Sequence, residues 1–106
     1  MVLLLVELVD EVEVEVAVPA RFALEQNYPN PFNPATLIKY SIPQDQQVKL
    51  NVYNLLGENV TTLVNSFQKA GQHEVSFNAS NLASGVYFYK LEAGTQTSIK
   101  KMILMK

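Results

Sequence analysis

Hydrophobic and polar residues alternate with a period of two along much of this chain. The most regular stretch, EVEVEVAV, covers residues 11–18 and is followed by Pro19. Because successive side chains of a strand point to opposite faces, the valines share one face and the glutamates the other. The pattern predicts a half-buried strand over Asp10–Val18 that ends at the proline.

Six further β-type segments follow, separated by turn residues such as Gly57, Gly71 and Gly94. They are Thr36–Ile42, Gln47–Tyr53, Glu58–Leu63, Gln72–Phe77, Val86–Ala93 and Gln96–Met105. Strands that recur about every 8–12 residues, without a convincing helix, predict an all-β antiparallel sandwich. The sandwich has seven strands if Asp10–Val18 belongs to it, and only Asn81–Ala83 fits a single helical turn.

Three prolines stand within the segment Pro29-Asn30-Pro31-Phe32-Asn33-Pro34, here called the proline loop. Proline fixes its own φ, lacks an amide donor and favours extended backbone in the residue before it. The spacing therefore predicts a stiff, ordered structural loop. Phe32 is the side chain expected to anchor this loop to the body of the domain.

The last predicted strand carries apolar side chains on both faces. Ile99, Ile103 and Met105 lie on one face, and Met102 and Leu104 on the other. Two apolar faces indicate either a central strand or an edge strand whose outer face awaits a partner. The neighbouring Lys100, Lys101 and Lys106 suit an acidic receptor and suit plain solubility equally well, so both interpretations stay open.

Composition narrows the possible functions. With 106 residues the chain is one domain's worth, and 10 acidic against 8 basic residues argue against a nucleic-acid surface. The absence of cysteine excludes disulfides, thiolate metal sites and thiol catalysis. No apolar run approaches the length of a transmembrane helix. The apolar start of the chain lacks a preceding base and is cut short by Glu7, so it does not fit a secretory signal.

Residues that could carry chemistry do not converge. The single histidine, His73, is followed in its strand by Glu74, and adjacent strand residues point to opposite faces. His73 is therefore expected at the rim of the sandwich, and Tyr87 and Tyr89 share a face as ordinary core packing. The sequence contains no calcium-type loop and no glycine-rich phosphate loop. We expect no enzyme activity, no cofactor and no metal site.

Several separated blocks resemble one known family. They are residues 22–34 (FALEQNYPNPFNP), 36–40 (TLIKY), 42–43 (IP), 48–57 (VKLNVYNLLG) with Val60, 70–73 (AGQH), 82–87 (LASGVY) and 101–106 (KMILMK). In this order they are similar to the type IX (Por) secretion system C-terminal sorting domain, type A, over about residues 22–106. A related Ig-like domain of flagellar hook-capping proteins shares part of the proline-loop pattern, which keeps a second assignment open.

The resemblance implies a seven-stranded antiparallel Ig-like β-sandwich at the carboxyl end of an exported cargo protein. It implies that the type IX translocon and its shuttle components recognise the domain at the outer membrane, after transit through the periplasm. A surface sortase commonly removes such a domain upstream, here before Phe22, and the cargo is released or anchored to anionic lipopolysaccharide at the cell surface. The implied recognition residues are Gly85, Val86, Tyr87, Lys100, Lys101, Met102, Ile103, Leu104, Met105 and Lys106.

Residues 1–21 do not fit the family pattern and are interpreted separately from residues 22–106. The first 20 residues contain five acidic residues and no base. This segment is expected to be an acidic strand or linker, either the end of an upstream cargo domain or a donated arm. As an arm it would add to the open sheet edge of a neighbouring copy, and repeated addition would build an extracellular filament. Self-assembly is therefore the alternative to a sorting function.

Overall fold

The structure is a computed structural model that describes residues 20–106 of the chain. Within that range it contains seven β-strands and no helix. The strands are β2 (Ala23–Leu24), β3 (Ala35–Ile42), β4 (Gln46–Tyr53), β5 (Asn59–Gln68), β6 (Gly71–Asn78), β7 (Gly85–Ala93) and β8 (Gln96–Leu104).

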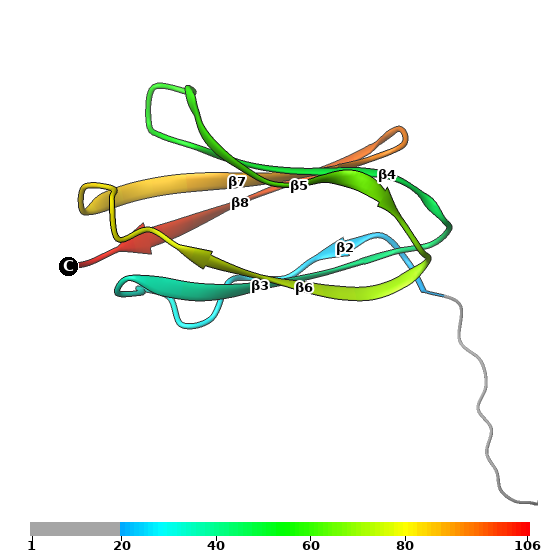
Figure 1. The fold of residues 1–106 in the computed structure, drawn as a ribbon, viewed down its shortest axis with the longest axis horizontal. Helices are drawn as coiled ribbons and strands as arrows, with labels where there is room; N and C mark the ends of the chain where they lie inside the picture. Colours follow the sequence, from blue (N-terminus) through cyan, green and yellow to red (C-terminus); the bar gives the residue numbers. More distant parts are fainter. Residues whose placement is uncertain (1–19) are drawn as a thin grey trace, which may run out of the picture.

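The strands form two layers that face each other (Figure 1). One sheet has the order β2-β3-β6 and the other the order β5-β4-β7-β8, and every pairing between these strands is antiparallel. The chain crosses between the layers after β3, β5 and β6, as in an Ig-like sandwich. The predicted fold class is confirmed.

Two element predictions need correction, those for the end of β5 and for a helical turn at Asn81–Ala83. The predicted strand Asp10–Val18 lies outside the described residues and stays a prediction, whereas the first described strand, Ala23–Leu24, was not predicted. Strand β5 continues to Gln68 instead of ending at Leu63, because irregularities in its pairing with β4 shift the phase of its side chains and hide the period of two. In place of a helical turn at Asn81–Ala83, a single hydrogen-bonded turn is present, in which the Leu82 N–H donates to the Ala79 carbonyl at 3.0 Å.

The core draws on alternate residues of β3, β4, β7 and β8, as the period of two predicts. Its fully buried side chains include Ile38, Ile42, Val48, Leu50, Val52, Tyr89, Leu91, Met102 and Leu104. Burying a large apolar side chain contributes about 1.5–3 kcal/mol, so these rows provide the main force that holds the layers together.

Two tyrosines of β7 add directed contacts to this packing. The Tyr87 hydroxyl donates to the Ala83 carbonyl at 2.7 Å, just before the strand begins. A tyrosine at this corner, bonded to the backbone a few residues upstream, is a hallmark of Ig-like domains. The Tyr89 hydroxyl donates to the Glu25 carbonyl at 2.7 Å and accepts from the Asn27 N–H at 2.8 Å, which ties β7 to the segment after β2.

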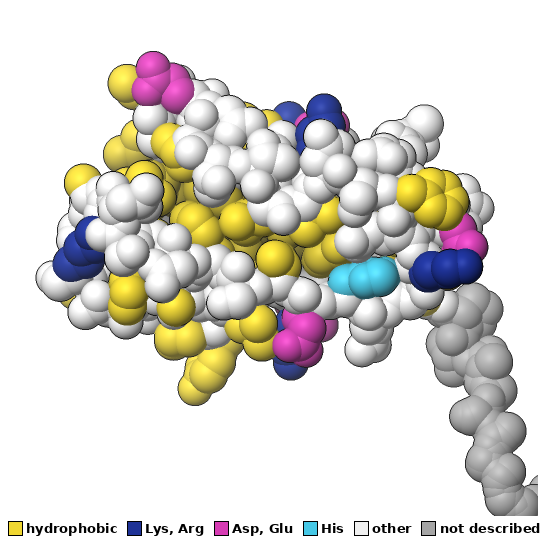
Figure 2. All heavy atoms as spheres, viewed as in Figure 1, with side chains coloured by type: hydrophobic (Ala, Val, Ile, Leu, Met, Phe, Trp, Pro, Cys, Tyr) yellow, Lys and Arg dark blue, Asp and Glu magenta, His cyan; other side chains and the backbone are white. Residues whose placement is uncertain are grey.

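The two flanks of the sandwich differ. On one flank the edge strands β2 and β8 lie close together. On the other, β5 and β6 are both edge strands, and their inward residues Val64 and Val75 remain partly exposed. Figure 2 shows a band of hydrophobic side chains between the layers on the face viewed there.

Candidate partner-recognition surface

The terminal strand β8 lies at an edge, pairing with β7 alone in the four-stranded sheet. Of the two positions that the sequence allowed, central or edge, the edge is the one observed. Its inward residues Met102 and Leu104 are buried in the core. Near its carboxyl end the outward residues Lys101 and Ile103, together with Met105 just after the strand, are here called the outer row. Of these Lys101 and Met105 are exposed and Ile103 is half-buried.

The structure brings the two implied recognition elements together. Val86 pairs with Ile103, and Gly85 pairs with Leu104 at the start of β7. Tyr87 is only 8 % exposed, and its hydroxyl donates a hydrogen bond to the backbone carbonyl of Ala83. Buried residues cannot touch a partner while the domain stays folded, so Tyr87, Met102 and Leu104 support the fold. The accessible members of the implied set are the outer row and Gly85, Val86, Lys100 and Lys106.

The proline loop lies along the free edge of β8. The Phe32 N–H donates to the Ile103 carbonyl at 2.9 Å, and the Met105 N–H donates to the Phe32 carbonyl at 2.9 Å. The ring of Phe32 is 2 % exposed and packs against Phe77, with centroids 6.1 Å apart. The buried ring thus fastens the loop to the core, and Phe32 also forms a parallel bridge to Leu104.

Two side chains extend this contact. The Ile103 N–H donates to Asn30 Oδ1 at 2.9 Å, and Gln26 Nε2 donates to the Lys101 carbonyl at 2.7 Å. We call the contacts of Gln26, Asn30 and Phe32 with β8 the clasp. Sequence patterns did not predict it, because the paired residues are more than 70 positions apart.

Lys106 is hydrogen-bonded to the connection that precedes β7. Its backbone N–H donates to Ser84 Oγ at 3.0 Å, and its Nζ donates to the Ser80 carbonyl at 2.6 Å. Both serines belong to the connection between β6 and β7. The last residues are therefore ordered by contacts on two sides.

A shallow apolar hollow adjoins the terminal strand on the outer face of the four-stranded sheet. Its volume is about 410 Å³, and its lining includes Tyr53, Leu55, Phe88 and Ile99. Leu55 and Ile99 are 69 % and 58 % exposed. The sequence analysis did not identify this hollow as a site. The signal was present, since Phe88 and Ile99 occupy outward positions where polar residues are usual.

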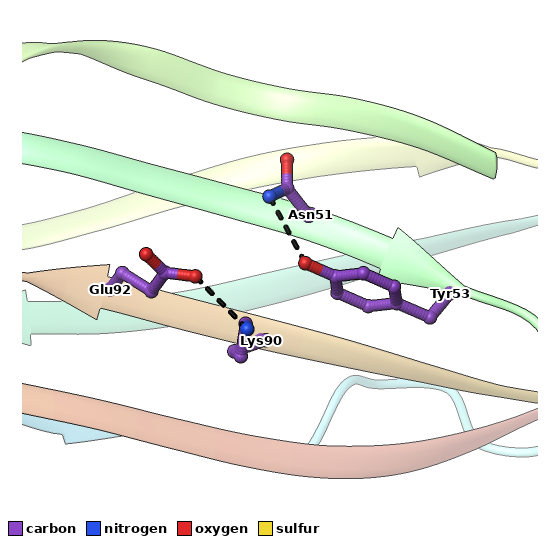
Figure 3. Close-up of polar contacts among 4 residues, drawn as sticks. All are labelled: Asn51, Tyr53, Lys90 and Glu92. Carbon is purple, nitrogen blue, oxygen red and sulfur yellow. Dashed lines mark hydrogen bonds and ion pairs between the residues drawn. The ribbon is translucent and has the colours of Figure 1, made fainter. Parts of the chain in front are cut away.

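Two lining residues of this hollow, Tyr53 and Lys90, also make polar contacts, with Asn51 and Glu92 respectively (Figure 3). Lys90 Nζ lies 3.1 Å from Glu92 Oε2 and 5.4 Å from the centre of the Tyr53 ring. The hydrogen bond to Glu92 raises the pKa of Lys90 above its usual value, and the Tyr53 side chain adds to the effect. Asn51 Nδ2 donates to the Tyr53 hydroxyl at 3.3 Å, whereas the buried Asn51 Oδ1 has no hydrogen-bond partner among the described residues.

His73 occupies the rim position predicted for it. Its ring stacks on Tyr40 with centroids 5.3 Å apart, and its Nε2 lies 2.7 Å from the Lys69 carbonyl. A hollow of about 280 Å³ is lined by His73, Glu25 and Glu74 among others. Residues 20–106 show no hydrogen bond or ion pair between the imidazole and a carboxylate.

Residues 20–106 hold neither a cluster of metal ligands nor a helix that could cross a membrane. No group of three or more potential metal ligands comes together there. None of the described segments is a helix of the length and apolarity that crossing a membrane requires.

Comparison with known proteins identifies what the chain resembles. Residues 26–105 match the family model described as the secretion system C-terminal sorting domain. No curated protein matches the chain.

Two solved structures share the fold. Dimeric latent PorU from Porphyromonas gingivalis matches with a TM-score of 0.63 and 16 % identity over 87 % of this chain. PorZ of the same organism, described as an essential surface component of the type-IX secretion system, matches with a TM-score of 0.52 and 15 % identity over 80 % of this chain. The chain corresponds to only 10 % and 11 % of those two proteins, respectively.

Proposed function

The chain belongs to the secretion system C-terminal sorting domain family, and on that premise we propose that it is a non-catalytic signal for the type IX translocon. The match over residues 26–105 carries this proposal, because it includes the proline loop, both layers and the terminal strand. The likeness to PorU and PorZ supports the choice of the type IX system. The signal directs an exported cargo, fused upstream, to the cell surface for release or anchoring.

We also propose an export route and the proteins that recognise the domain along it. The cargo crosses the periplasm, and translocon, shuttle and sortase proteins at the outer membrane recognise the domain. Cleavage falls before Phe22, upstream of the sandwich. The accessible members of the implied recognition set are Gly85, Val86, Lys100, Lys101, Ile103, Met105 and Lys106.

A reporter fusion tests the proposed function. The chain is placed downstream of an exported reporter in a bacterium that has a type IX system, and surface reporter is measured by its accessibility to added protease. Deleting residues 101–106 is expected to trap the reporter in the periplasm. Because this deletion also removes Met102 and Leu104 from the core, a second variant is needed that leaves the core intact.

Lys101→Glu combined with Met105→Glu reverses or adds charge on the outer row without changing a buried residue. We expect surface reporter to fall at least several-fold, with the thermal midpoint of the purified chain unchanged within a few degrees. The matched control is Lys69→Glu, an exposed residue between β5 and β6, which should leave export unchanged. Normal surface delivery by the outer-row variant would refute a recognition role for β8.

Self-assembly is the second candidate, and the open flank between β5 and β6 favours it. Within residues 20–106 no strand pairs with the second edge of either β5 or β6, and Val64 and Val75 are partly exposed between them. A strand with one apolar face suits such a site, because main-chain hydrogen bonds add to side-chain burial. The segment Asp10–Val18 has this alternation in sequence, and we propose it as the donated strand.

Light scattering distinguishes this candidate from the first. The full chain should form larger species as its concentration rises, whereas a chain lacking residues 1–20 and the variant Val14→Asp/Val16→Asp should remain monomeric. A full chain that stays monomeric at high concentration would rule out strand donation without affecting the export assay.

A further inference from the structure

The clasp has no assigned role in the proposed function. It consists of four hydrogen bonds. The Phe32 N–H and Gln26 Nε2 are donors to β8, and the Phe32 carbonyl and Asn30 Oδ1 are acceptors. Together they occupy the Lys101 carbonyl, the Ile103 N–H and carbonyl, and the Met105 N–H.

These groups are the ones that a partner strand would need. Backbone groups of an edge strand alternate between its neighbour and the free side, so alternate residues from Lys101 onward present theirs away from β7. Because the clasp takes them, the edge of β8 over residues 101–105 is closed to strand addition. Opening it by removing the loop would expose the buried ring of Phe32 to water, which is unfavourable.

What stays accessible there is a row of side chains on a fixed backbone. Lys101 and Met105 are exposed, and Ile103 lies beside Val86. The ion pair found among the described residues joins Lys90 and Glu92, which leaves Lys101 without a carboxylate partner. A partner surface that fits this row has an apolar area that covers Ile103 and Met105. It also carries a carboxylate that pairs with the ammonium group of Lys101.

We propose that Asn30 is a positioning residue for the terminal signal. By holding the Ile103 N–H it keeps the edge closed and the outer row in place, so that a partner with an apolar, carboxylate-bordered surface recognises side chains and adds no strand. The inference rests on the proposed sorting function. Asn30 is the separable part of the clasp, because its side chain is exposed whereas Phe32 also fills the core.

Amide exchange on the full chain tests the positioning role independently of export. In Asn30→Ala the Ile103 amide loses its acceptor, and the loss of about 1 kcal/mol should speed its exchange about fivefold. The Phe88 amide in the neighbouring strand should be unaffected. Asn30→Asp retains a side-chain acceptor and should restore slow exchange.

The matched control is Asn33→Ala. This exposed residue belongs to the same loop, and no hydrogen bond joins its side chain to β8 in the described residues. Exchange at Ile103 should remain as in the parent chain. If Asn30→Ala leaves Ile103 exchange unchanged, or Asn33→Ala speeds it equally, Asn30 does not position the strand and the inference is overturned.

The reporter assay then tests how the strand is recognised. We expect Asn30→Ala to lower surface delivery several-fold, and Asn30→Asp and Asn33→Ala to preserve it. A rise with Asn30→Ala would mean that the contact restrains the strand against its partner, and unchanged delivery would mean that the contact is irrelevant to recognition. Either result overturns the inference, whereas failure of the parent chain itself to be exported would overturn the proposed function, with the exchange data still reporting on the clasp.

Discussion

Tyr89 illustrates how one side chain joins two parts of this sandwich. Its hydroxyl is hydrogen-bonded to the Glu25 carbonyl and to the Asn27 N–H, and both Tyr89 and Asn27 are buried. In Tyr89→Phe the Asn27 N–H loses its acceptor, which should lower the free energy of unfolding by about 1–3 kcal/mol. Urea denaturation of the two proteins measures the difference.

Tyr28→Phe is the control for that measurement. Tyr28 is 81 % exposed, and its loss of a hydroxyl should change stability by less than about 0.5 kcal/mol. Equal effects of the two substitutions would show that the hydroxyl of Tyr89 does not join β7 to the segment after β2.

The same residue predicts a dependence on pH. Burial raises the pKa of Tyr89 from 10.0 to about 12, although the hydrogen bond from Asn27 opposes the shift. Since the fold favours the neutral phenol, its contribution to stability is complete below about pH 10 and is lost as the pH rises through about 12. Denaturation midpoints should therefore fall over this range, and the fall should be smaller in Tyr89→Phe. Parallel curves for the two proteins would contradict the assignment.

Gly94 is required by the turn that joins β7 to β8. Its φ is +61°, and a Cβ there would lie 2.8 Å from Gln46 Oε1. Gly94→Ala should destabilise the domain by about 1–2 kcal/mol, measured by thermal denaturation, because the left-handed conformation is unfavourable for alanine. Combining Gly94→Ala with Gln46→Ala separates backbone strain from the clash with Gln46. A loss of stability that persists in the double variant comes from the backbone, and one that disappears comes from the clash.

Strands whose side chains alternate without interruption were predicted well from the sequence. The predicted ends of β3, β4, β6, β7 and β8 lie within one or two residues of the observed ends. The end of β5 was missed because pairing irregularities break its alternation, and β2 has only two residues, too few to give a pattern. The clasp could not be predicted, since hydrogen bonds between distant residues leave no local period.

The proline loop is the element whose loss should matter most outside the strands. Phe32→Ala removes a buried ring and should cost about 3–5 kcal/mol in unfolding free energy. Phe32→Leu keeps much of the volume and should lose clearly less. If both variants match the parent chain in urea, the ring does not anchor the loop.

The whole sandwich depends on its final strand. Met102 and Leu104 are 0 % and 1 % exposed, and β8 covers one side of β7. Deleting residues 96–106 should therefore abolish the cooperative thermal transition seen by circular dichroism. The outer-row variant Lys101→Glu/Met105→Glu keeps these core residues and should melt cooperatively. A sharp transition in the deleted chain would show that the remaining strands fold without β8.

The clasp joins residues from opposite ends of the described domain: Gln26 and Asn30 on one side, Lys101 and Ile103 on the other. Neither segment acquires this arrangement until both have been made and the intervening strands have assembled. If a secretion system recognises only a terminal strand held in this way, it would not export truncated or misfolded chains. The requirement for a folded domain would then act as quality control without a separate factor.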